Sequence, residues 1–233
     1  ELTPLLESID KQNKEKEAIA NMRKEFSANV SHELKTPLTS ISGYAEIMKS
    51  GIVKPEDMPR FSEKIYNEAR RLITLVEDII KLSHLDEGKV ELEKEDIDLY
   101  ELTREIISRL APQASAKKVH MELTGESVIY NGVRQILDEM VYNICENAIK
   151  YNFPGGRVFV TVRRDGDQVL LEAADTGVGI PEDELPKVFN RFYRVDKARS
   201  RAAGGTGLGL SIVRDTVRRH GGWVTAQRRQ SEG

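Results

Sequence analysis

The chain has 233 residues with 39% hydrophobic content, enough for two domains of ordinary size, each with its own core. Its formal charge of -3 argues against a general binder of nucleic acids or anionic membranes. The single cysteine, Cys145, excludes an internal disulfide framework. No apolar run approaches the roughly 20 residues of a membrane-spanning helix. Because the sequence opens at Glu1 without a methionine or a secretory leader, we expect a soluble fragment of a longer protein.

The first predicted element is a long helix. Residues 1–18 are mostly polar and are interpreted as a linker helix from a missing upstream sensor module, with a simple solvated helix as the alternative. From Ile19 to Met48, apolar or small residues recur at steps of three or four, which predicts one buried stripe. The helix is expected to end at Ser50-Gly51, because glycine favours a helix C-terminus.

A second amphipathic helix is expected between the loop at 54–57 and Gly88. Two long helices joined by a short loop form an antiparallel hairpin. A lone hairpin cannot surround its own apolar stripe, so we predict that residues 19–88 dimerise into a four-helix bundle. The alternative is a hairpin covered by the second domain of the same chain.

After Gly88, short strands alternate with helices, so residues 89–233 are predicted to form an α+β domain with helices layered on a mixed, mostly antiparallel sheet. Asp98 and Asn131 are the expected caps of its first two helices. The expected strands are 90–93, 119–123, 128–130, 157–164, 168–174 and 223–227, and the expected helices are 98–116, 132–151, 181–189 and 208–220. The D-G-D sequence at 165–167 is a strong signal for a hairpin between two of these strands.

One histidine lies off the apolar stripe of the first helix. At about 100° per residue, His32 is turned away from its buried neighbours, so its imidazole faces outward. Glu33 can reach the ring from the flank, and Thr36 lies one turn further along the same face. Pro37 removes a backbone donor and predicts a bend just past the site. On spacing alone, an ordinary surface histidine is the favoured interpretation.

Two segments of the second domain have side chains suited to a nucleotide. Asn143 and Asn147 lie one turn apart on a helix and offer amide oxygens to Mg²⁺ or hydrogen bonds to phosphate, with Lys150 on nearly the same side. Asp175 ends a strand in D-T-G-V-G-I, where it can accept a hydrogen bond from an exocyclic amine. Each feature alone is also explained as a polar helix face or a strand end.

Two further segments favour polyphosphate. The loop 204–210 is rich in glycine and runs into a helix, where exposed N–H groups and the helix dipole form an anion site. It lacks the lysine of a P-loop, so alone it is weak evidence. The basic segment 187–201 would attract phosphates, although most charge runs are merely solvated. Its aromatic residues would either hinge a lid or anchor the core; they are Phe189, Phe192 and Tyr193.

The order of these motifs is more informative than any one of them. S-H-E-L-K-T-P-L on a hairpin is followed by an asparagine-rich helix, then D-T-G-V-G-I, F-N-R-F-Y and G-G-T-G-L-G-L. This series resembles the transmitter core of sensor histidine kinases, over roughly residues 20 to 230. The resemblance implies a dimerisation and histidine phosphotransfer domain followed by a catalytic Bergerat-type ATP-binding domain, a fold shared with type II topoisomerases, ninety-kilodalton heat-shock chaperones and mismatch-repair ATPases.

The resemblance also assigns roles to nucleotide-site residues. Asp175 would bind adenine N6, Asn147 would ligate Mg²⁺, and Asn143 and Lys150 would lie near the phosphates. Tyr151 would line the site. The other implied ATP-binding residues lie in the two glycine motifs: Gly177, Gly179, Ile180, Gly205, Thr206, Gly207, Leu208 and Gly209.

The implied function is an ATP-dependent protein-histidine kinase that autophosphorylates His32 beside Glu33. The phosphoryl group would then pass to an aspartate on the receiver domain of a response regulator, and Thr36 would support dephosphorylation of that regulator. We expect a homodimer with no nucleic-acid partner. Membrane attachment would come only through missing upstream segments, which implies the cytoplasmic portion of a bacterial inner-membrane sensor.

Two features of the sequence depart from the family pattern. Glu146 places an additional acid beside Asn147, either as a ligand or as a group that repels phosphate. The chain stops at 230–233, before the usual final G-T-x-F strand, which would leave an unpaired sheet edge. The alternatives to a kinase are a Bergerat ATPase that drives conformational work, and a degenerate scaffold. The remaining histidines are expected at surfaces or interfaces, and Cys145 in the core; these histidines are His84, His120 and His220.

Overall fold

The computed structural model describes residues 3–87, 93–196, 200 and 204–228. Contacts divide the chain into two compact units, Glu1–Glu77 and Asp78–Gly233. This division falls earlier than the boundary near residue 88 expected from the sequence. Each unit is therefore described by itself.

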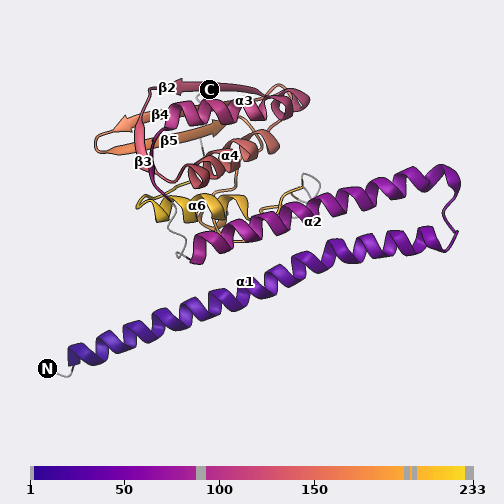
Figure 1. Ribbon diagram of the computed structural model, residues 1–233, viewed down its shortest axis with the longest axis horizontal. Coiled ribbons are helices and arrows are strands. Elements are labelled where there is room, and N and C mark those ends of the chain that lie inside the picture. The colour runs from indigo at the N-terminus through magenta and orange to yellow at the C-terminus, as the bar shows by residue number, and fades with distance from the viewer. Residues whose placement is uncertain (1–2, 88–92, 197–199, 201–203, 229–233) are drawn as a thin grey trace. The chain divides into compact units, whose positions relative to one another are not determined.

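The first unit contains the helical hairpin expected from the sequence. Helix α1 (Thr3–Lys49) is followed by the 3₁₀ turn η1 (Pro55–Asp57) and by helix α2 (Met58–Glu87), whose first twenty residues belong to this unit (Figure 1). Helix α1 is continuous from Thr3 and stays helical through Pro37. Gly51 follows its end in the left-handed region, with φ of 74°.

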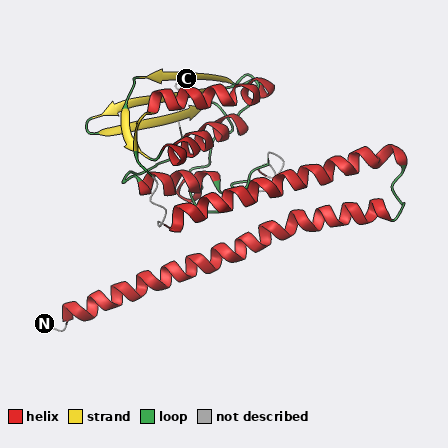
Figure 2. Ribbon diagram, in the orientation of Figure 1, coloured by secondary structure: helices red, strands yellow, loops and turns green. Residues whose placement is uncertain are grey.

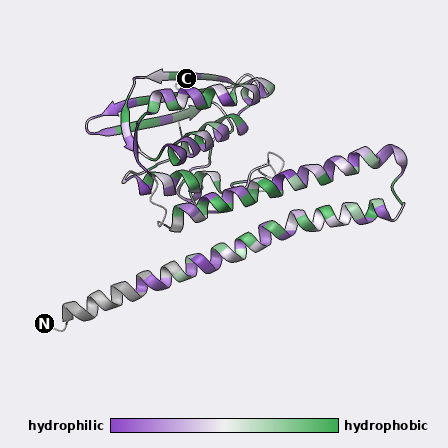
Figure 3. Ribbon diagram, in the orientation of Figure 1, coloured by the Kyte–Doolittle hydropathy of each residue, from purple (hydrophilic) through white to green (hydrophobic). Residues whose placement is uncertain are grey.

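The hairpin leaves apolar side chains uncovered. Figure 3 shows hydrophobic and hydrophilic positions interspersed along α1 and α2. On α1, Met22 is 62% exposed and Leu38 is 52% exposed, and on α2, Ile73 is 50% exposed. Large apolar side chains exposed along both helices are consistent with an interaction face.

The second unit is an α+β domain, as expected (Figure 2). Its core is one cluster in which the helices and the strand β4 (Arg157–Asp165) contribute fully buried side chains, including Ile106, Val141 and Val160. Cys145 is also fully buried there, and desolvation raises the pKa of its thiol to about 12. The elements after α2 are β1 (Glu95–Asp98), α3 (Leu99–Lys117), β2 (His120–Gly125), β3 (Ile129–Gly132), α4 (Arg134–Lys150), β4 (Arg157–Asp165), β5 (Gln168–Asp175), the 3₁₀ turn η2 (Leu185–Lys187) and α6 (Gly209–Arg219).

The sheet is mixed and mostly antiparallel, as predicted. In the larger sheet, the order is β2-β4-β5; β2 pairs with β4 in parallel and β4 pairs with β5 antiparallel. The tight turn between β4 and β5 is the D-G-D hairpin expected from the sequence, with Asp165 opposite Gln168. Strands β1 and β3 form a separate antiparallel pair.

Asn131 does not cap a helix as expected. It lies in β3, where its side chain donates to Asp96 Oδ1 at 2.8 Å, so pairing with β1 replaces the capping role. Helix α4 begins at Arg134 instead, and its N-cap is Val133. The backbone N–H of Val133 donates to Nε2 of His220 at 3.3 Å, so that half-buried histidine contacts the start of α4.

Two other expected elements differ. Residues 223–227 form no strand, because a strand needs a hydrogen-bonded neighbour and the structure pairs none with this segment among the residues that it describes. Within 181–189, only the short turn η2 forms, next to Pro181 and Pro186, which lack backbone donors. The expected strand at 90–93 lies mostly outside the described residues; β1 begins at Glu95.

The last turns of α2 pack within the second unit. Leu82 is fully buried there. The guanidinium of Arg219, on α6, donates to the backbone carbonyls of His84 at 3.4 Å and Leu85 at 3.3 Å. The last carbonyls of a helix have no partner within the helix, so this arginine satisfies two of them.

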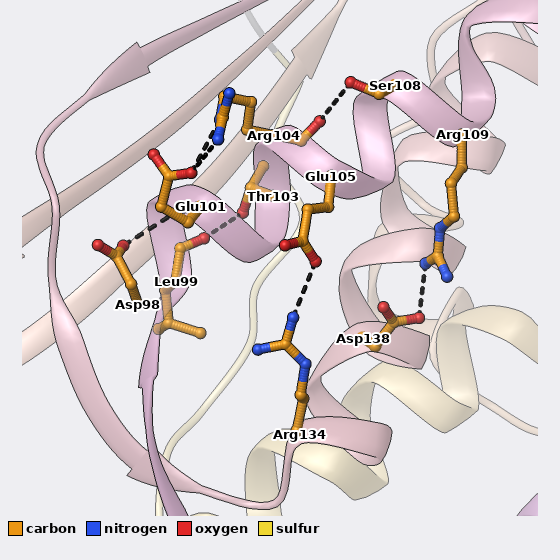
Figure 4. A network of polar contacts seen from close by, with 10 residues as sticks. All are labelled: Asp98, Leu99, Glu101, Thr103, Arg104, Glu105, Ser108, Arg109, Arg134 and Asp138. Carbon is orange, nitrogen blue, oxygen red and sulfur yellow. Dashed lines mark hydrogen bonds and ion pairs between the residues drawn. The ribbon is translucent and has the colours of Figure 1, made fainter.

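Polar contacts join α3 to β1 and to α4 (Figure 4). Asp98 caps α3, as predicted: its Oδ1 accepts from the N–H of Tyr100 at 2.9 Å and from that of Glu101 at 3.2 Å. Arg109 pairs with Asp138 on α4 at 2.6 Å. Because ion pairs open to solvent contribute little, the cap is the more important of these contacts.

Replacing Asp98 with alanine is expected to lower the free energy of unfolding of the second unit by about 1 kcal/mol, because two helix N–H groups lose their acceptor. Hydrogen bonds lower the pKa of Asp98 below 3.8, and the bond from the Ser127 side chain has the largest effect. The contribution of its charge is therefore present above pH 3.8 and is lost as the pH falls through the folded-state pKa. Urea denaturation at pH 7 and below pH 3.8 measures both effects.

Asp183→Ala serves as the control, since that side chain is exposed in a loop. Equal unfolding free energies for Asp98→Ala and the parent chain at pH 7 would contradict the capping role.

Candidate functional site

His32 lies on α1 with its imidazole open to solvent. The side chain is 79% exposed, while Pro37 further along the helix is buried. The Nδ1 atom of His32 lies 4.0 Å from Oε1 of Glu33, within ion-pair range but beyond a hydrogen bond. Thr36 Oγ1 donates to the backbone carbonyl of His32 at 3.1 Å. The ring is thus accessible, with one carboxylate beside the Nδ1 atom.

Arg71, on α2, holds the other oxygen of Glu33. Its Nη2 lies 3.6 Å from Glu33 Oε2, and its Nη1 lies 3.8 Å from Glu68 Oε2. The arginine side chain is only 10% exposed, so these charges interact where water screens them less. Arg71 was not predicted from the sequence, because pairing across a hairpin depends on register, which periodicity does not give.

The two asparagines expected at a nucleotide site share one face of α4. Asn143 is 8% exposed, and its Nδ2 donates to the backbone carbonyl of Glu139 at 2.9 Å and to Glu139 Oε1 at 3.3 Å. These bonds turn Oδ1 of Asn143 toward the glycine loop. A β-carbon added to Gly209 would lie 2.8 Å from that oxygen and 3.7 Å from Nδ2 of Asn147. Glycine at 209 therefore permits the loop to approach both asparagines.

Lys150 ends α4 near the asparagines. Desolvation lowers the pKa of Lys150, and the negative charges of Glu146 and Asp78 oppose that shift. A lysine in this environment loses less hydration when it binds an anion than a fully solvated one does. Glu146, whose role the sequence left open, accepts a hydrogen bond from the hydroxyl of Tyr142 at 3.4 Å.

Asp175 and the backbone of Tyr151 come together at the end of β5. Gly177 donates its N–H to Asp175 Oδ1 at 2.8 Å, and Val178 donates its N–H to the carbonyl of Tyr151 at 3.0 Å. A β-carbon on Gly177 would lie 2.4 Å from that carbonyl oxygen, so only glycine fits there. Desolvation raises the pKa of Asp175, and the Gly177 hydrogen bond partly offsets it. Gly179 and Ile180 continue this turn.

Asn152 holds the two sides of this corner together and was not singled out from the sequence. It is 5% exposed, donates to the carbonyl of Arg157 at 3.0 Å and accepts from the hydroxyl of Thr176 at 3.4 Å. A buried amide that satisfies backbone groups fixes the path of the chain. The asparagine directly before Phe153-Pro154 was the available signal, because this residue type favours turns.

The glycine loop is tied to residues from three other places. Thr206 is 7% exposed, and its hydroxyl donates to Asp78 Oδ2 at 2.6 Å and accepts from the N–H of Leu208 at 3.2 Å. Its carbonyl accepts from Arg194 at 2.7 Å. Next to it, the hydroxyl of Tyr151 lies 3.1 Å from Ser200 Oγ. Gly207 packs on the backbone of Phe192, and a β-carbon there would lie 2.9 Å away.

Two cations of the basic segment 187–201 are paired with acids. Arg191 pairs with Asp215, on α6, at 2.8 Å, and Lys187 pairs with Glu184 at 3.4 Å. Its members Lys197, Arg199 and Arg201 lie outside the described residues. The lid function expected for this segment stays a prediction.

These residues come together within the second unit as the candidate nucleotide site. One helix presents amides, one loop presents backbone donors at a helix start, and Asp175 lies at a corner where glycine lets the backbone approach closely. Such a set fits an adenine nucleotide. Among the residues that the structure describes, no group of three or more His, Cys, Asp or Glu could hold a metal ion by itself. A Mg²⁺ ion needs only one or two protein oxygens when nucleotide phosphates supply others, so Asn147 fits that role.

The described helices include none that combines the length and the apolar character needed to cross a lipid bilayer.

Two family models match the chain. The His Kinase A (phospho-acceptor) domain matches residues 22–88, and the model of histidine kinase-, DNA gyrase B- and HSP90-like ATPases matches residues 132–233. The first match includes His32, Glu33 and Thr36. The second includes all the candidate nucleotide residues on α4 and in the glycine motifs.

Curated relatives are sensor histidine kinases. The sensor histidine kinase WalK of Bacillus subtilis is 37% identical over 230 residues, which cover 94% of this chain and 36% of that protein. A sensor protein kinase WalK of Staphylococcus aureus is 35% identical over 222 residues, covering 94% of this chain and 54% of that protein. The chain thus spans about a third to a half of the length of these relatives.

Solved structures agree. A structure of the histidine kinase ThkA in complex with the response regulator protein TrrA is 26% identical, with a TM-score of 0.70, over 88% of this chain and 58% of that one. The histidine kinase AdeS of Acinetobacter baumannii is 25% identical, with a TM-score of 0.64, over 80% of this chain and 86% of that one. Because both domain models match and the curated relatives agree, the chain belongs to the sensor histidine kinase family and forms its two-component transmitter core.

Proposed function

We propose that this chain is an ATP-dependent protein-histidine kinase that phosphorylates His32 and passes the phosphoryl group to an aspartate on the receiver domain of a response regulator. The observation that carries the proposal is the exposed imidazole of His32 with the Glu33 carboxylate 4.0 Å from Nδ1. A structural histidine would be packed or hydrogen-bonded through both ring nitrogens. Here one nitrogen has an adjacent carboxylate and the ring is open to an incoming substrate.

The chemistry assigned to His32 follows from this arrangement. Glu33 favours the tautomer with the proton on Nδ1, which leaves the lone pair of Nε2 free. In the reaction, the Nε2–phosphorus bond forms as the bond from the γ-phosphorus to the ADP oxygen breaks. The imidazole becomes positively charged, and the Glu33 carboxylate stabilises that charge. Arg71 keeps Glu33 in position through its contact with the other carboxylate oxygen.

We assign nucleotide binding to the site on the second unit. Asp175 accepts from the adenine amine, Tyr151 lines the site, and Asn143 and Lys150 lie near the phosphates. The loop Gly205–Gly209 provides backbone donors for the phosphates at the start of α6. Asn147 would hold Mg²⁺, which supplies neutralisation of phosphate charge when bound.

The proposed partners are a second copy of the chain and a receiver domain. The uncovered apolar side chains of α1 and α2 support pairing into a four-helix bundle, because burying them removes apolar surface from water. The ThkA structure contains the response regulator protein TrrA, which supports a receiver-domain partner. We place the chain on the cytoplasmic side of a bacterial membrane sensor, because its relatives are longer proteins named as sensors.

Incubation with γ-³²P-labelled ATP and Mg²⁺ tests the kinase activity. The parent chain is expected to acquire label that is stable to base and labile to acid, because a phosphorus–nitrogen bond hydrolyses in acid. His32→Ala should lose this label completely. His84→Ala, which removes another exposed helical histidine, should retain it.

Three results would contradict the proposal: label that persists in His32→Ala, acid-stable label, or release of inorganic phosphate by the parent without protein label. The last result would support a Bergerat ATPase instead.

Asp175→Asn is expected to weaken binding of ATP by about 10- to 100-fold, because the carboxylate hydrogen bond to adenine is lost. The same change should raise the free energy of unfolding without nucleotide. The raised pKa of Asp175 means that its contribution to stability is present below pH 3.8 and is lost as the pH rises through the folded-state pKa. The variant should therefore exceed the parent in stability at pH 7 and match it near pH 3.

Calorimetric titration with ATP and urea denaturation measure the two effects. Asp167→Asn, in the β4–β5 turn, is the matched control and should change neither. Unchanged ATP affinity in Asp175→Asn would exclude this residue from the adenine site.

Thr36→Ala tests the proposed phosphatase role. The variant should retain labelling of His32 but dephosphorylate a phosphorylated receiver domain at least tenfold more slowly, because the hydroxyl that positions a water is lost. Thr39→Ala is the control, since Thr39 makes the same type of hydrogen bond, to the carbonyl of Lys35 at 2.9 Å. Equal phosphatase rates in Thr36→Ala and the parent would refute the role.

A further inference from the structure

Asp78 is a buried acid for which the proposed reaction has no use. It lies near the end of α2, within the second unit, and is 8% exposed. Its Oδ2 accepts the hydroxyl hydrogen bond of Thr206 at 2.6 Å. Thr206 lies in the glycine loop that is assigned to the nucleotide phosphates. A side chain from the last turns of α2 thus reaches the glycine loop within the second unit.

The contact uses donors that a phosphate group would need. The Thr206 hydroxyl donates its proton to Asp78, and the N–H of Leu208 is directed at the Thr206 oxygen at 3.2 Å. Leu208 immediately precedes α6, where backbone N–H groups otherwise face an anion. The Leu208 N–H, the Thr206 hydroxyl and the Asp78 carboxylate therefore form one chain of hydrogen bonds.

Both cations and acids act on the charge of Asp78. Lys81 attracts the Asp78 carboxylate, and Asp78 in turn acts on the charge of Lys150. Glu139 and Glu146 repel it, and desolvation is the largest of the effects that raise its pKa. Lys81 and the Thr206 hydroxyl thus favour an anion at this position. Glu139 and Glu146 oppose the addition of further negative charge.

A second contact joins α2 to the asparagine helix. Lys81, one turn after Asp78, pairs with Glu139 Oε1 at 2.7 Å. Glu139 is the residue that orients the amide of Asn143. The last turns of α2 are thereby attached to both sides of the candidate phosphate site.

We infer that the carboxylate of Asp78 occupies the phosphate loop in place of a nucleotide phosphate, so that the end of α2 sets the nucleotide affinity of the chain. This inference rests on the proposed nucleotide site. Bringing a polyphosphate to Thr206 and Lys150 places like charges together, so the Thr206–Asp78 bond must break for the phosphates to bind. The apparent affinity for nucleotide is then the intrinsic affinity multiplied by the fraction of molecules in which Asp78 does not hold the loop.

The test is calorimetric binding of ADP to the full chain. Asp78→Ala is expected to bind ADP roughly 3- to 10-fold more tightly than the parent, which corresponds to a loop held by Asp78 in most molecules. Asp78→Asn removes the charge but keeps an acceptor, so its affinity should lie between the two. Glu77→Gln removes an exposed charge from the adjacent position on the helix and should leave ADP affinity unchanged.

Hydrogen exchange without nucleotide provides a second measurement. In Asp78→Ala, the amide of Leu208 should exchange faster than in the parent and in Glu77→Gln, because the acceptor of the hydroxyl that orders it is gone. Unchanged exchange would show that Asp78 does not hold the loop and would overturn the inference.

The ADP titration separates this inference from the proposed function. If the parent binds ADP but Asp78→Ala binds it equally or more weakly, the proposed competition between Asp78 and phosphate is overturned, and the proposed nucleotide site is not. Absence of ADP binding in both the parent and the variant contradicts the proposed nucleotide site and the competition together.

Discussion

The geometry of the candidate nucleotide site depends on how closely the start of α6 approaches α4. The contact of Gly209 with the amide oxygen of Asn143 sets this distance, since a β-carbon at 209 would lie only 2.8 Å from that oxygen. The approach brings backbone donors of the loop beside two amide side chains. Asn143 keeps its orientation because Glu139 accepts both of its donated hydrogen bonds. A larger residue at 209 would force apart the two elements that supply the proposed phosphate-binding groups.

A site built to bind a charged ligand must also satisfy its polar groups when the ligand is absent, because unpaired buried donors are costly. The structure meets this requirement locally. Gly177 donates to Asp175, and Leu208 donates to Thr206, whose own hydroxyl has an acceptor. Ligand binding in this site is therefore an exchange of partners rather than the filling of unpaired groups. The free energy of binding is the difference between the two sets of hydrogen bonds.

Much of the fold was predictable from the sequence. The hairpin, the cap at Asp98 and the D-G-D turn arise from periodicity or local chemistry, which act within a few residues. Asn131 was misassigned because its capping tendency competes with pairing to β1, and pairing is a long-range property. The residues of the glycine motifs were recognised by type, but the contacts of Arg71, Asn152 and Asp78 depend on register and tertiary packing, which local patterns do not specify.

The burial of Cys145 has a practical consequence. This thiol is fully enclosed on α4 and has a pKa near 12, so at neutral pH almost none of it is the reactive thiolate. The sequence contains no other cysteine. Maleimide dyes or spin labels should therefore react at cysteines engineered into the surface with little background from the native residue. Distances across the chain become measurable by spectroscopy without first removing a core side chain.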